Sequence, residues 1–412
     1  MAEGLDLLNN VELTTLVILD VYLAIDWYNQ NMNFDGLEFL IVGSGFFGSV
    51  LAERVATVLG KKVIIVEKRG HIGGNSYSGL CSQTGIEEHL YGAHIFHTSN
   101  KRVWDYIRSF SDFTNYQHRV FTEYKSVIYP LPISLATINA FYKKQLRPYE
   151  VEAFMQNERA NENIVNPTNL EEMAISLIGR PLYEAFIKGY TKKQWDKDPR
   201  FLPANIITRL PVRKNYNNNY FNDSYQGLPQ NGYFKLFENI LSNPKIEVKL
   251  NTNFFEIKEK IPSSCHIIFT GPIDQYFNYK FGALEWRGLR FVREVLNYED
   301  FQGTAVMNYA DELVPYTRIH EFRHFHPERV APANKTLVVR EYPQAWKVGE
   351  DPYYPMGTKE NLDRYELYRR EAASISNLHI GGRMGQYCYL DMDKTILLAL
   401  ELFDKIRVRY AT

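Results

Sequence analysis

The chain of 412 residues is long enough to form two or three domains with sizeable hydrophobic cores. Its 47 Lys and Arg residues nearly balance its 48 Asp and Glu residues, which leaves a formal charge of −1. This balance excludes a general attraction to nucleic acid or to an anionic membrane, so an anionic ligand would need a local cluster of arginines. Three scattered cysteines form neither a disulfide framework nor a metal-ligand pattern, so we expect a reduced, cytoplasmic compartment and no metal: Cys81, Cys265 and Cys388.

The apolar segment at residues 13–25 follows an acidic stretch, whereas a secretory signal follows a basic one. Asp20 interrupts the segment and Asp26 ends it, so it is shorter than the roughly 20 apolar residues of a membrane-spanning helix. We therefore expect no membrane span. We expect residues 1–36 to be an extension that packs on the main body or on the second subunit of a homodimer.

The main body begins with a strand–turn–helix–strand pattern between residues 38 and 67. Its turn, residues 43–48 (GSGFFG), is a GxGxxG motif that precedes helical spacing at residues 49–59 and a second buried strand at residues 61–67. In this motif Gly43 makes the tight turn, Gly45 lets a pyrophosphate approach the backbone, and Gly48 allows close helix–strand packing. Glu67 ends the second strand, where a carboxylate can bind a ribose. The pattern predicts a Rossmann-type dinucleotide site.

Two further glycine pairs favour FAD over NAD as the dinucleotide. Gly73-Gly74 lies just beyond the acidic residue, and Gly381-Gly382 follows a predicted strand far downstream, beside Arg383. No second GxGxxG motif is present for a nicotinamide cofactor. We therefore predict FAD, bound by a set of glycines and polar side chains from these turns: Gly43, Gly45, Gly48, Glu67, Lys68, Gly74, Asn75 and Arg383.

The remaining chain changes pattern twice. Residues 132–206 have mostly helical spacing, and residues 281–356 contain short β-rich runs such as Thr304–Tyr309 and Thr336–Val339. A final helix is predicted from about Asp393 onward.

Ordered blocks of sequence from Glu38 to Leu402 resemble the UDP-galactopyranose mutases. The blocks are residues 91–98 (YGAHIFHT), 187–195 (IKGYTKKQW), 209–213 (RLPVR), 219–221 (NYF), 225–227 (YQG), 270–274 (TGPID), 281–285 (FGALE), 316–318 (YTR) and 352–355 (PYYP). The resemblance implies an α/β fold in which a Rossmann-type FAD-binding domain carries an inserted helical domain and an antiparallel β-sheet domain. The FAD-binding domain would comprise residues 37–115, 228–280 and 357–412, the helical substrate domain with a mobile loop residues 132–206, and the sheet domain residues 116–131, 207–227 and 281–356.

The resemblance also implies an isomerase that interconverts UDP-galactopyranose and UDP-galactofuranose for cell-surface glycans and works only with reduced FAD. Flavin N5 would attack the anomeric carbon and displace UDP, and the covalently held sugar would open and reclose through its other hydroxyl. The partners implied are a UDP-sugar and an external electron donor. The same reaction on UDP-N-acetylgalactosamine stays open, as do a flavin amine-oxidase-type oxidoreductase and a flavin- and nucleotide-binding protein without turnover.

The resemblance assigns three candidate catalytic residues. Arg209 and Arg318 match the arginines that hold the pyrophosphate, where a permanent charge and a planar fork suit phosphate oxygens. His97 would lie near the flavin and could bond to it or to the sugar.

The resemblance further assigns residues to the base, the sugar and the phosphates. Phe186 and Tyr190, four apart on one face of a predicted helix, would stack on uracil, and Thr191 would bond to its edge. Trp195 would seat the substrate from a mobile polar loop. Asn308 would lie close to the sugar, and three tyrosines would bond to the phosphates beside an acid that orients an arginine: Tyr220, Tyr354, Tyr389 and Asp391.

Overall fold

The computed structural model describes residues 33–160, 162–207 and 212–410. The extension predicted at residues 1–36 therefore falls almost wholly outside the described residues, and so does Arg209. The expected homodimer contact, which was assigned to that extension, stays a prediction.

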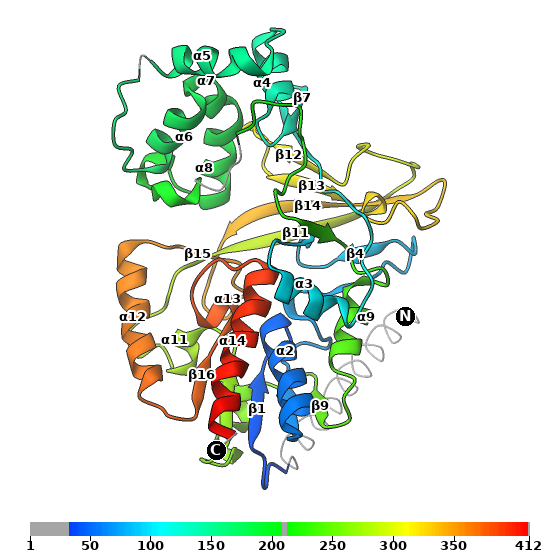
Figure 1. Cartoon of the computed structure of the whole chain (residues 1–412), viewed down its shortest axis with the longest axis vertical. Coiled ribbons are helices and arrows are strands. Elements are labelled where there is room, and N and C mark those ends of the chain that lie inside the picture. The colour runs from blue at the N-terminus through cyan, green and yellow to red at the C-terminus, as the bar shows by residue number, and fades with distance from the viewer. Residues whose placement is uncertain (1–32, 161, 208–211, 411–412) are drawn as a thin grey trace, which may run out of the picture.

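A five-stranded parallel sheet forms the centre of the lower half of the molecule (Figure 1). Phe39 and Ile41 of its central strand face one hydrophobic core, whereas Leu40 faces another, because successive strand residues point to opposite sides. Both strands predicted around the glycine turn are confirmed. The sheet order is β16 (Leu378–Ile380), β10 (His266–Phe269), β1 (Phe39–Val42), β2 (Val63–Val66) and β9 (Ile246–Lys249).

Helices cover both faces of this sheet, as buried parallel strands require. The first core is closed by α2 (Phe46–Arg54) with its π-helical continuation η1 (Val55–Leu59), α3 (Lys101–Arg108), α9 (Gly232–Ile240) and α14 (Met392–Tyr410). The second is closed by α10 (Phe254–Ile257), α11 (Ile273–Tyr276) and α12 (Lys359–Ala373). The helices predicted at residues 49–59 and after Asp393 are confirmed. None of the helices in the described ranges is both long and apolar enough to span a membrane.

A seven-stranded sheet lies above the parallel sheet in Figure 1. Its neighbouring strands pair antiparallel except β12 and β6, which run parallel. The β-rich runs predicted at Thr304–Tyr309 and Thr336–Val339 both contribute strands. The order is β15 (Tyr354–Pro355), β11 (Trp286–Leu296), β14 (Thr336–Ala345), β13 (Arg318–Glu321), β12 (Val306–Tyr309), β6 (Val120–Tyr124) and β7 (Val127–Leu131).

A helical unit with its own hydrophobic core stands on the outer end of this sheet (Figure 1). It contains α4 (Leu135–Tyr142), α5 (Pro148–Arg159), α6 (Leu170–Ile178), α7 (Arg180–Leu182), the π-helix η3 (Tyr183–Lys188), α8 (Gly189–Trp195) and two 3-10 turns, η4 (Pro199–Phe201) and η5 (Ala204–Ile206). Together the three parts confirm the predicted fold class, a Rossmann-type α/β domain with a helical insertion and a largely antiparallel sheet.

Shorter elements connect these parts. Two small antiparallel ribbons pair β3 (Ser78–Leu80) with β4 (Glu87–His89), and β5 (Phe96–Thr98) with β8 (Tyr225–Gly227). Single turns of helix occur at η2 (Gly74–Ser76), η6 (Lys258–Lys260), η7 (Phe322–His324) and α13 (Gly382–Gly385). The β5–β8 ribbon brings residues 96–98 against the segment that follows the helical unit.

Candidate active site

A cavity of about 560 Å³ lies where the parallel strands end. Because the carboxyl ends of parallel strands meet at one edge of a sheet, the residues that follow β1, β2, β10 and β16 gather there. All eight residues predicted to bind the cofactor line this cavity: Gly43, Gly45, Gly48, Glu67, Lys68, Gly74, Asn75 and Arg383.

The three glycines of the GxGxxG turn do three different things. Gly43 has a φ of +98°, and a Cβ there would meet Thr270 Oγ1 at 2.3 Å. A Cβ on Gly48 would meet the carbonyl oxygen of Gly43 at 2.1 Å, so this glycine allows the helix to pack on the strand. A Cβ on Gly45 would meet nothing closer than the Cα of Gly74, at 3.9 Å. Packing within the protein therefore does not require a glycine at position 45, and the missing side chain leaves space in the cavity.

The helix that follows the turn presents backbone donors to the same cavity. Gly45 caps α2 without a side-chain hydrogen bond, and no acidic residue occupies the first turn. The free N–H groups and the positive end of the helix dipole form a site for a phosphate. Glu67 Oε2 accepts hydrogen bonds from Ser44 N at 2.9 Å and Ser44 Oγ at 2.8 Å. Glu67 Oε1 accepts a third hydrogen bond, from Arg69 N at 2.9 Å, so the carboxylate is oriented beside the turn and retains one lone pair for a ribose hydroxyl.

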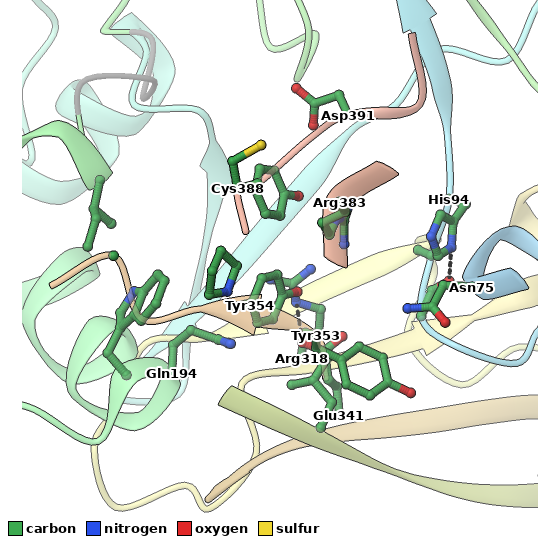
Figure 2. Close-up of a pocket in the computed structure, with 18 of the residues that line it drawn as sticks. Asn75, His94, Gln194, Arg318, Glu341, Tyr353, Tyr354, Arg383, Cys388 and Asp391 are labelled. Carbon is green, nitrogen blue, oxygen red and sulfur yellow. Dashed lines mark hydrogen bonds and ion pairs between the residues drawn. The ribbon is translucent and has the colours of Figure 1, made fainter. Parts of the chain in front are cut away.

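A second cavity, of about 640 Å³, lies among α8, the seven-stranded sheet and the segment between α13 and α14 (Figure 2). It adjoins the first cavity, because both are lined by Asn75, His94, Arg383 and Met392. The fold brings together nine of the predicted catalytic and substrate-binding residues around it: His97, Tyr190, Trp195, Tyr220, Asn308, Arg318, Tyr354, Tyr389 and Asp391.

Arg318 lies at the start of β13 and carries a partly buried positive charge. Its guanidinium donates a hydrogen bond to the Tyr190 hydroxyl, and its Nε lies 3.4 Å from Glu341 Oε1 on the neighbouring strand β14. Burial alone would lower the pKa of Arg318, but Glu341, Tyr190 and Tyr354 raise it above its usual value. Within the described residues Arg318 Nε makes no hydrogen bond. The guanidinium therefore stays charged at the cavity, with its Nε directed at Glu341.

Aromatic side chains form part of the wall of the cavity. Tyr354 stacks with Tyr389 at 5.8 Å between ring centroids, and Trp195 lies 6.3 Å from Tyr354. The Arg383 guanidinium lies 4.6 Å from the centre of the Tyr389 ring and donates to the carbonyl oxygen of Leu390 at 2.7 Å. The wall thus combines flat apolar surfaces, tyrosine hydroxyls and a second cation.

Two predicted residues are not brought to this cavity. Phe186 is 5% exposed and packs in the helical core, with its ring 5.0 Å from Tyr129 and 5.4 Å from Phe141. Thr191 is also buried and does not line the cavity. Phe186 lies in the π-helical turn η3, whose apolar side chains pack in the helical core, and burial there removes its ring from water.

The segment around Trp195, predicted to be a loop, is helical through that residue. Helix α8 ends with Asp196 in the left-handed conformation, at a φ of 53°. Trp195 therefore projects from the last turn of a helix.

Two residues of the cavity were missed in the sequence. Glu341 is 2% exposed; burial by itself would raise its pKa, but Arg318 and His320 lower it below the usual value. Gln194 is 7% exposed, and both polar atoms of its amide lack a hydrogen-bond partner within the described chain. In Figure 2 the Gln194 amide points from α8 toward Arg318. For Glu341, the available signal was a lone acid in the largely apolar run at residues 337–342. For Gln194, it was the position four residues after Tyr190, which places both side chains on one helix face.

The opposite face of α8 is clamped to the turn between β12 and β13. Lys193 Nζ donates to the carbonyl oxygens of Tyr309, Asp311, Val314 and Tyr316 at 2.8 to 3.0 Å. One turn earlier, a Cβ on Gly189 would meet the carbonyl oxygen of residue 310 at 2.5 Å, so the helix backbone touches the same turn. This clamp fixes the helix that carries Tyr190 and Gln194 against the strand ends that carry Asn308 and Arg318.

Replacing Lys193 with methionine is expected to lower the free energy of unfolding by about 2–4 kcal/mol, because four carbonyl groups lose a charged donor. The neighbouring Lys192 offers a matched control, since it pairs with Glu312 of the same turn but is about half exposed. Lys192→Met should leave the stability almost unchanged, because an exposed ion pair contributes little. Urea unfolding followed by circular dichroism would measure both. Equal losses in the two variants would contradict the clamp.

The fold and the two adjoining cavities define a Rossmann-type dinucleotide-binding protein with a second, cation-lined ligand site. A family model described as an NAD(P)-binding Rossmann-like domain matches residues 41–110, and one described as UDP-galactopyranose mutase matches residues 185–389. The chain belongs to the UDP-galactopyranose mutase family.

Individual relatives support this membership. The chain is 41% identical to a probable UDP-galactopyranose mutase of Klebsiella pneumoniae, over 89% of this chain and 94% of the relative. It is 39% identical to a dTDP-fucopyranose mutase of Escherichia coli, over 88% and 96%. A solved structure of reduced UDP-galactopyranose mutase shares the fold at a TM-score of 0.67 and 15% identity, over 90% of this chain and 95% of that one.

Proposed function

We propose that the protein interconverts the pyranose and furanose forms of a nucleotide-linked sugar, UDP-galactose in the first place, with reduced FAD in the strand-end cavity. The observation that carries this proposal is the junction of the two cavities at Asn75, His94 and Arg383. A dinucleotide whose phosphates lie over α2 can reach the second cavity through this junction. The reacting atoms of the cofactor and the sugar would meet at this junction.

The residues of the first cavity fit FAD. The open space at Gly45, the uncapped N-terminus of α2 and the Glu67 carboxylate match a pyrophosphate and a ribose. The long cavity and the second glycine turn at Gly74 leave room for a group beyond the pyrophosphate. When bound and reduced, the flavin would supply an electron-rich ring nitrogen as the nucleophile. An external electron donor would be needed to reduce it.

The protein's own residues would bind the substrate and absorb the charge of the leaving diphosphate. Arg318 would bind the pyrophosphate and stabilise the negative charge that develops when the anomeric bond breaks. Arg209, which lies outside the described residues, would be the second cation. Tyr220, Tyr354 and Tyr389 would donate hydroxyl hydrogen bonds to the same phosphates, with Asp391 beside them.

The other residues would position the base and the sugar. Tyr190 and Trp195 would provide aromatic surface for the base and the ribose, and Asn308 would lie by the sugar. Gln194 is suited to bind the substrate as well, because a buried amide without a partner gains from a ligand that offers both a donor and an acceptor. The stacking and hydrogen-bonding roles predicted for Phe186 and Thr191 are not part of this proposal.

The identity of the sugar is the part of the proposal that sequence relatives leave open. The relative named a dTDP-fucopyranose mutase is nearly as similar as the one named a UDP-galactopyranose mutase. A dTDP-linked 6-deoxy sugar is therefore the second candidate, ahead of UDP-N-acetylgalactosamine.

The test is to incubate the purified protein with UDP-galactofuranose, dTDP-fucofuranose or the furanose form of UDP-N-acetylgalactosamine and to separate the products by chromatography. We expect conversion of UDP-galactofuranose to the pyranose form after reduction with dithionite, and no conversion by the fully oxidised protein. Faster conversion of dTDP-fucofuranose would assign the second candidate. Equal rates with and without reduction would contradict the role of the reduced flavin, and oxygen consumption with an amine substrate would favour an oxidase.

A further inference from the structure

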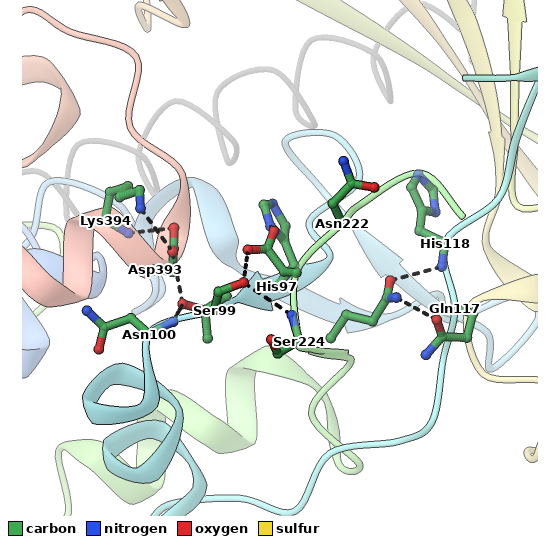
Figure 3. A network of polar contacts seen from close by, with 12 residues as sticks. His97, Ser99, Asn100, Gln117, His118, Asn222, Ser224, Asp393 and Lys394 are labelled. Carbon is green, nitrogen blue, oxygen red and sulfur yellow. Dashed lines mark hydrogen bonds and ion pairs between the residues drawn. The ribbon is translucent and has the colours of Figure 1, made fainter. Parts of the chain in front are cut away.

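The ring of His97 is held on two sides by the segment at residues 220–224. His97 lies in β5, opposite Gln226 of β8, so the two strands place this segment beside the ring. The Phe221 ring stacks on the imidazole at 3.7 Å between centroids and 13° between planes. His97 Nδ1 lies 2.7 Å from Asp223 Oδ2, within the polar network of Figure 3.

The carboxylate of Asp223 is itself fixed. Its other oxygen, Oδ1, accepts a hydrogen bond from Ser99 Oγ at 2.8 Å, and Ser99 Oγ in turn accepts one from the backbone N–H of Ser224 at 3.2 Å. The side chains of His97 and Asp223 are 17% and 30% exposed. Because both carboxylate oxygens are engaged, Asp223 has one orientation toward the ring.

This arrangement determines where the imidazole proton lies. A carboxylate only accepts hydrogen bonds, so Nδ1 of His97 carries the proton, and in the neutral ring the lone pair lies on Nε2. Across the described residues the bond to Asp223 is the only hydrogen bond of this ring. His97 lines the substrate cavity beside Tyr220 and Asn308, and Nε2 is on the side of the ring away from Asp223.

We propose that Asp223 is a positioning residue that holds the proton on Nδ1 of His97, so that Nε2 serves as the base for the sugar hydroxyl that attacks the anomeric carbon when a ring closes. In that step the O–H bond breaks, a ring C–O bond and an Nε2–H bond form, and the Asp223 carboxylate offsets the positive charge of the imidazole. When a ring opens, the Nε2–H bond breaks and its proton goes to the ring oxygen whose bond to the anomeric carbon breaks, so the isomerisation as a whole releases no proton. This role rests on the proposed function, whereas the position of the proton does not.

The position of the proton can be measured by ¹⁵N NMR on the full-length protein with labelled histidines, at alkaline pH where imidazoles are neutral. The His97→Gln variant identifies the His97 signals by their loss. We expect the wild-type ring to carry its proton on Nδ1, and Asp223→Asn to move it to Nε2, because the new amide donates to Nδ1. A wild-type ring protonated on Nε2, or no change in the variant, would overturn the proposal whether or not the protein has mutase activity.

Kinetics tests whether Asp223 acts through His97. We expect Asp223→Asn to lower kcat about 100-fold with little change in KM, as loss of a general base does. Asp112→Asn is the matched control, because Asp112 is an exposed carboxylate whose ion pair with Arg108 is 3.8 Å long. The double variant with His97→Gln should be no slower than His97→Gln alone. Two results would overturn the positioning role. One is that the kcat losses of the two single variants multiply in the double variant. The other is that Asp223→Asn lowers the melting temperature enough to account for its loss of activity.

Discussion

Replacing Arg318 by alanine is expected to lower kcat about 10³-fold while the flavin stays bound. The guanidinium is partly buried at the substrate cavity, and its charge is stabilised by Glu341 on the next strand. Without it, the negative charge of the departing diphosphate would have no cation at this position. Lysine should recover only part of the activity, because a point charge lacks the planar fork that binds two phosphate oxygens. Steady-state kinetics of the reduced enzyme and the flavin absorbance measure the two parts of this prediction.

The same substitution should also destabilise the fold, since Glu341 is 2% exposed and would lose its cation. The double variant Arg318→Met, Glu341→Gln separates the two effects, because it removes both charges and should recover stability without activity. Arg340→Ala is a suitable control on the same strand, as Arg340 pairs with Glu294 across the sheet, away from this cavity. Near-normal turnover by Arg318→Ala would remove Arg318 from the catalytic residues.

Gly45→Val is expected to give a folded protein that binds FAD at least about 100-fold more weakly. Gly45 has a φ of −70° and a ψ of −179°, which valine also adopts, and the added Cβ would meet no protein atom closer than 3.9 Å. The valine side chain would instead fill the space that a pyrophosphate needs at the N-terminus of α2. Absorbance of the purified protein and titration of the apoprotein with FAD measure the loss, and circular dichroism checks the fold.

Gly48 provides the contrast within the same turn. A Cβ there would meet the carbonyl oxygen of Gly43 at 2.1 Å and Ile41 Cγ2 at 2.9 Å, so Gly48→Ala should destabilise the protein by about 3 kcal/mol before any ligand is considered.

Yellow Gly45→Val protein with a full complement of FAD would show that the pyrophosphate does not bind over this turn.

The Rossmann-type unit could be predicted because its signals are local. The strand, the glycine turn and Glu67 each follow from residue type and spacing within 30 positions, and the roles of Gly43, Gly45 and Gly48 are those the turn geometry requires. The downstream return of Gly382 and Arg383 to the same cavity was also predictable, because parallel strands end at one edge.

The residues of the substrate cavity could be predicted from the sequence only where the family resemblance assigns them. Helical spacing placed Phe186 and Tyr190 on one face, but in the fold Phe186 packs in the helical core. Nothing in the sequence pairs Asp223 with His97, 126 positions earlier, because their contact depends on the β5–β8 ribbon. Glu341 likewise reaches Arg318 only through the register of β13 and β14.

The sequence by itself therefore determined the dinucleotide turn, the strands and helices of the parallel sheet, and the types of residue available for an anionic sugar nucleotide. The tertiary structure decided which of those residues meet at one cavity, which nitrogen of His97 faces a carboxylate, and that the Phe186 ring packs in the helical core. The physical reason is that backbone geometry and glycine sterics act between near neighbours in the chain. Hydrogen bonds and buried charges act between atoms that only the completed fold brings within about 3 Å.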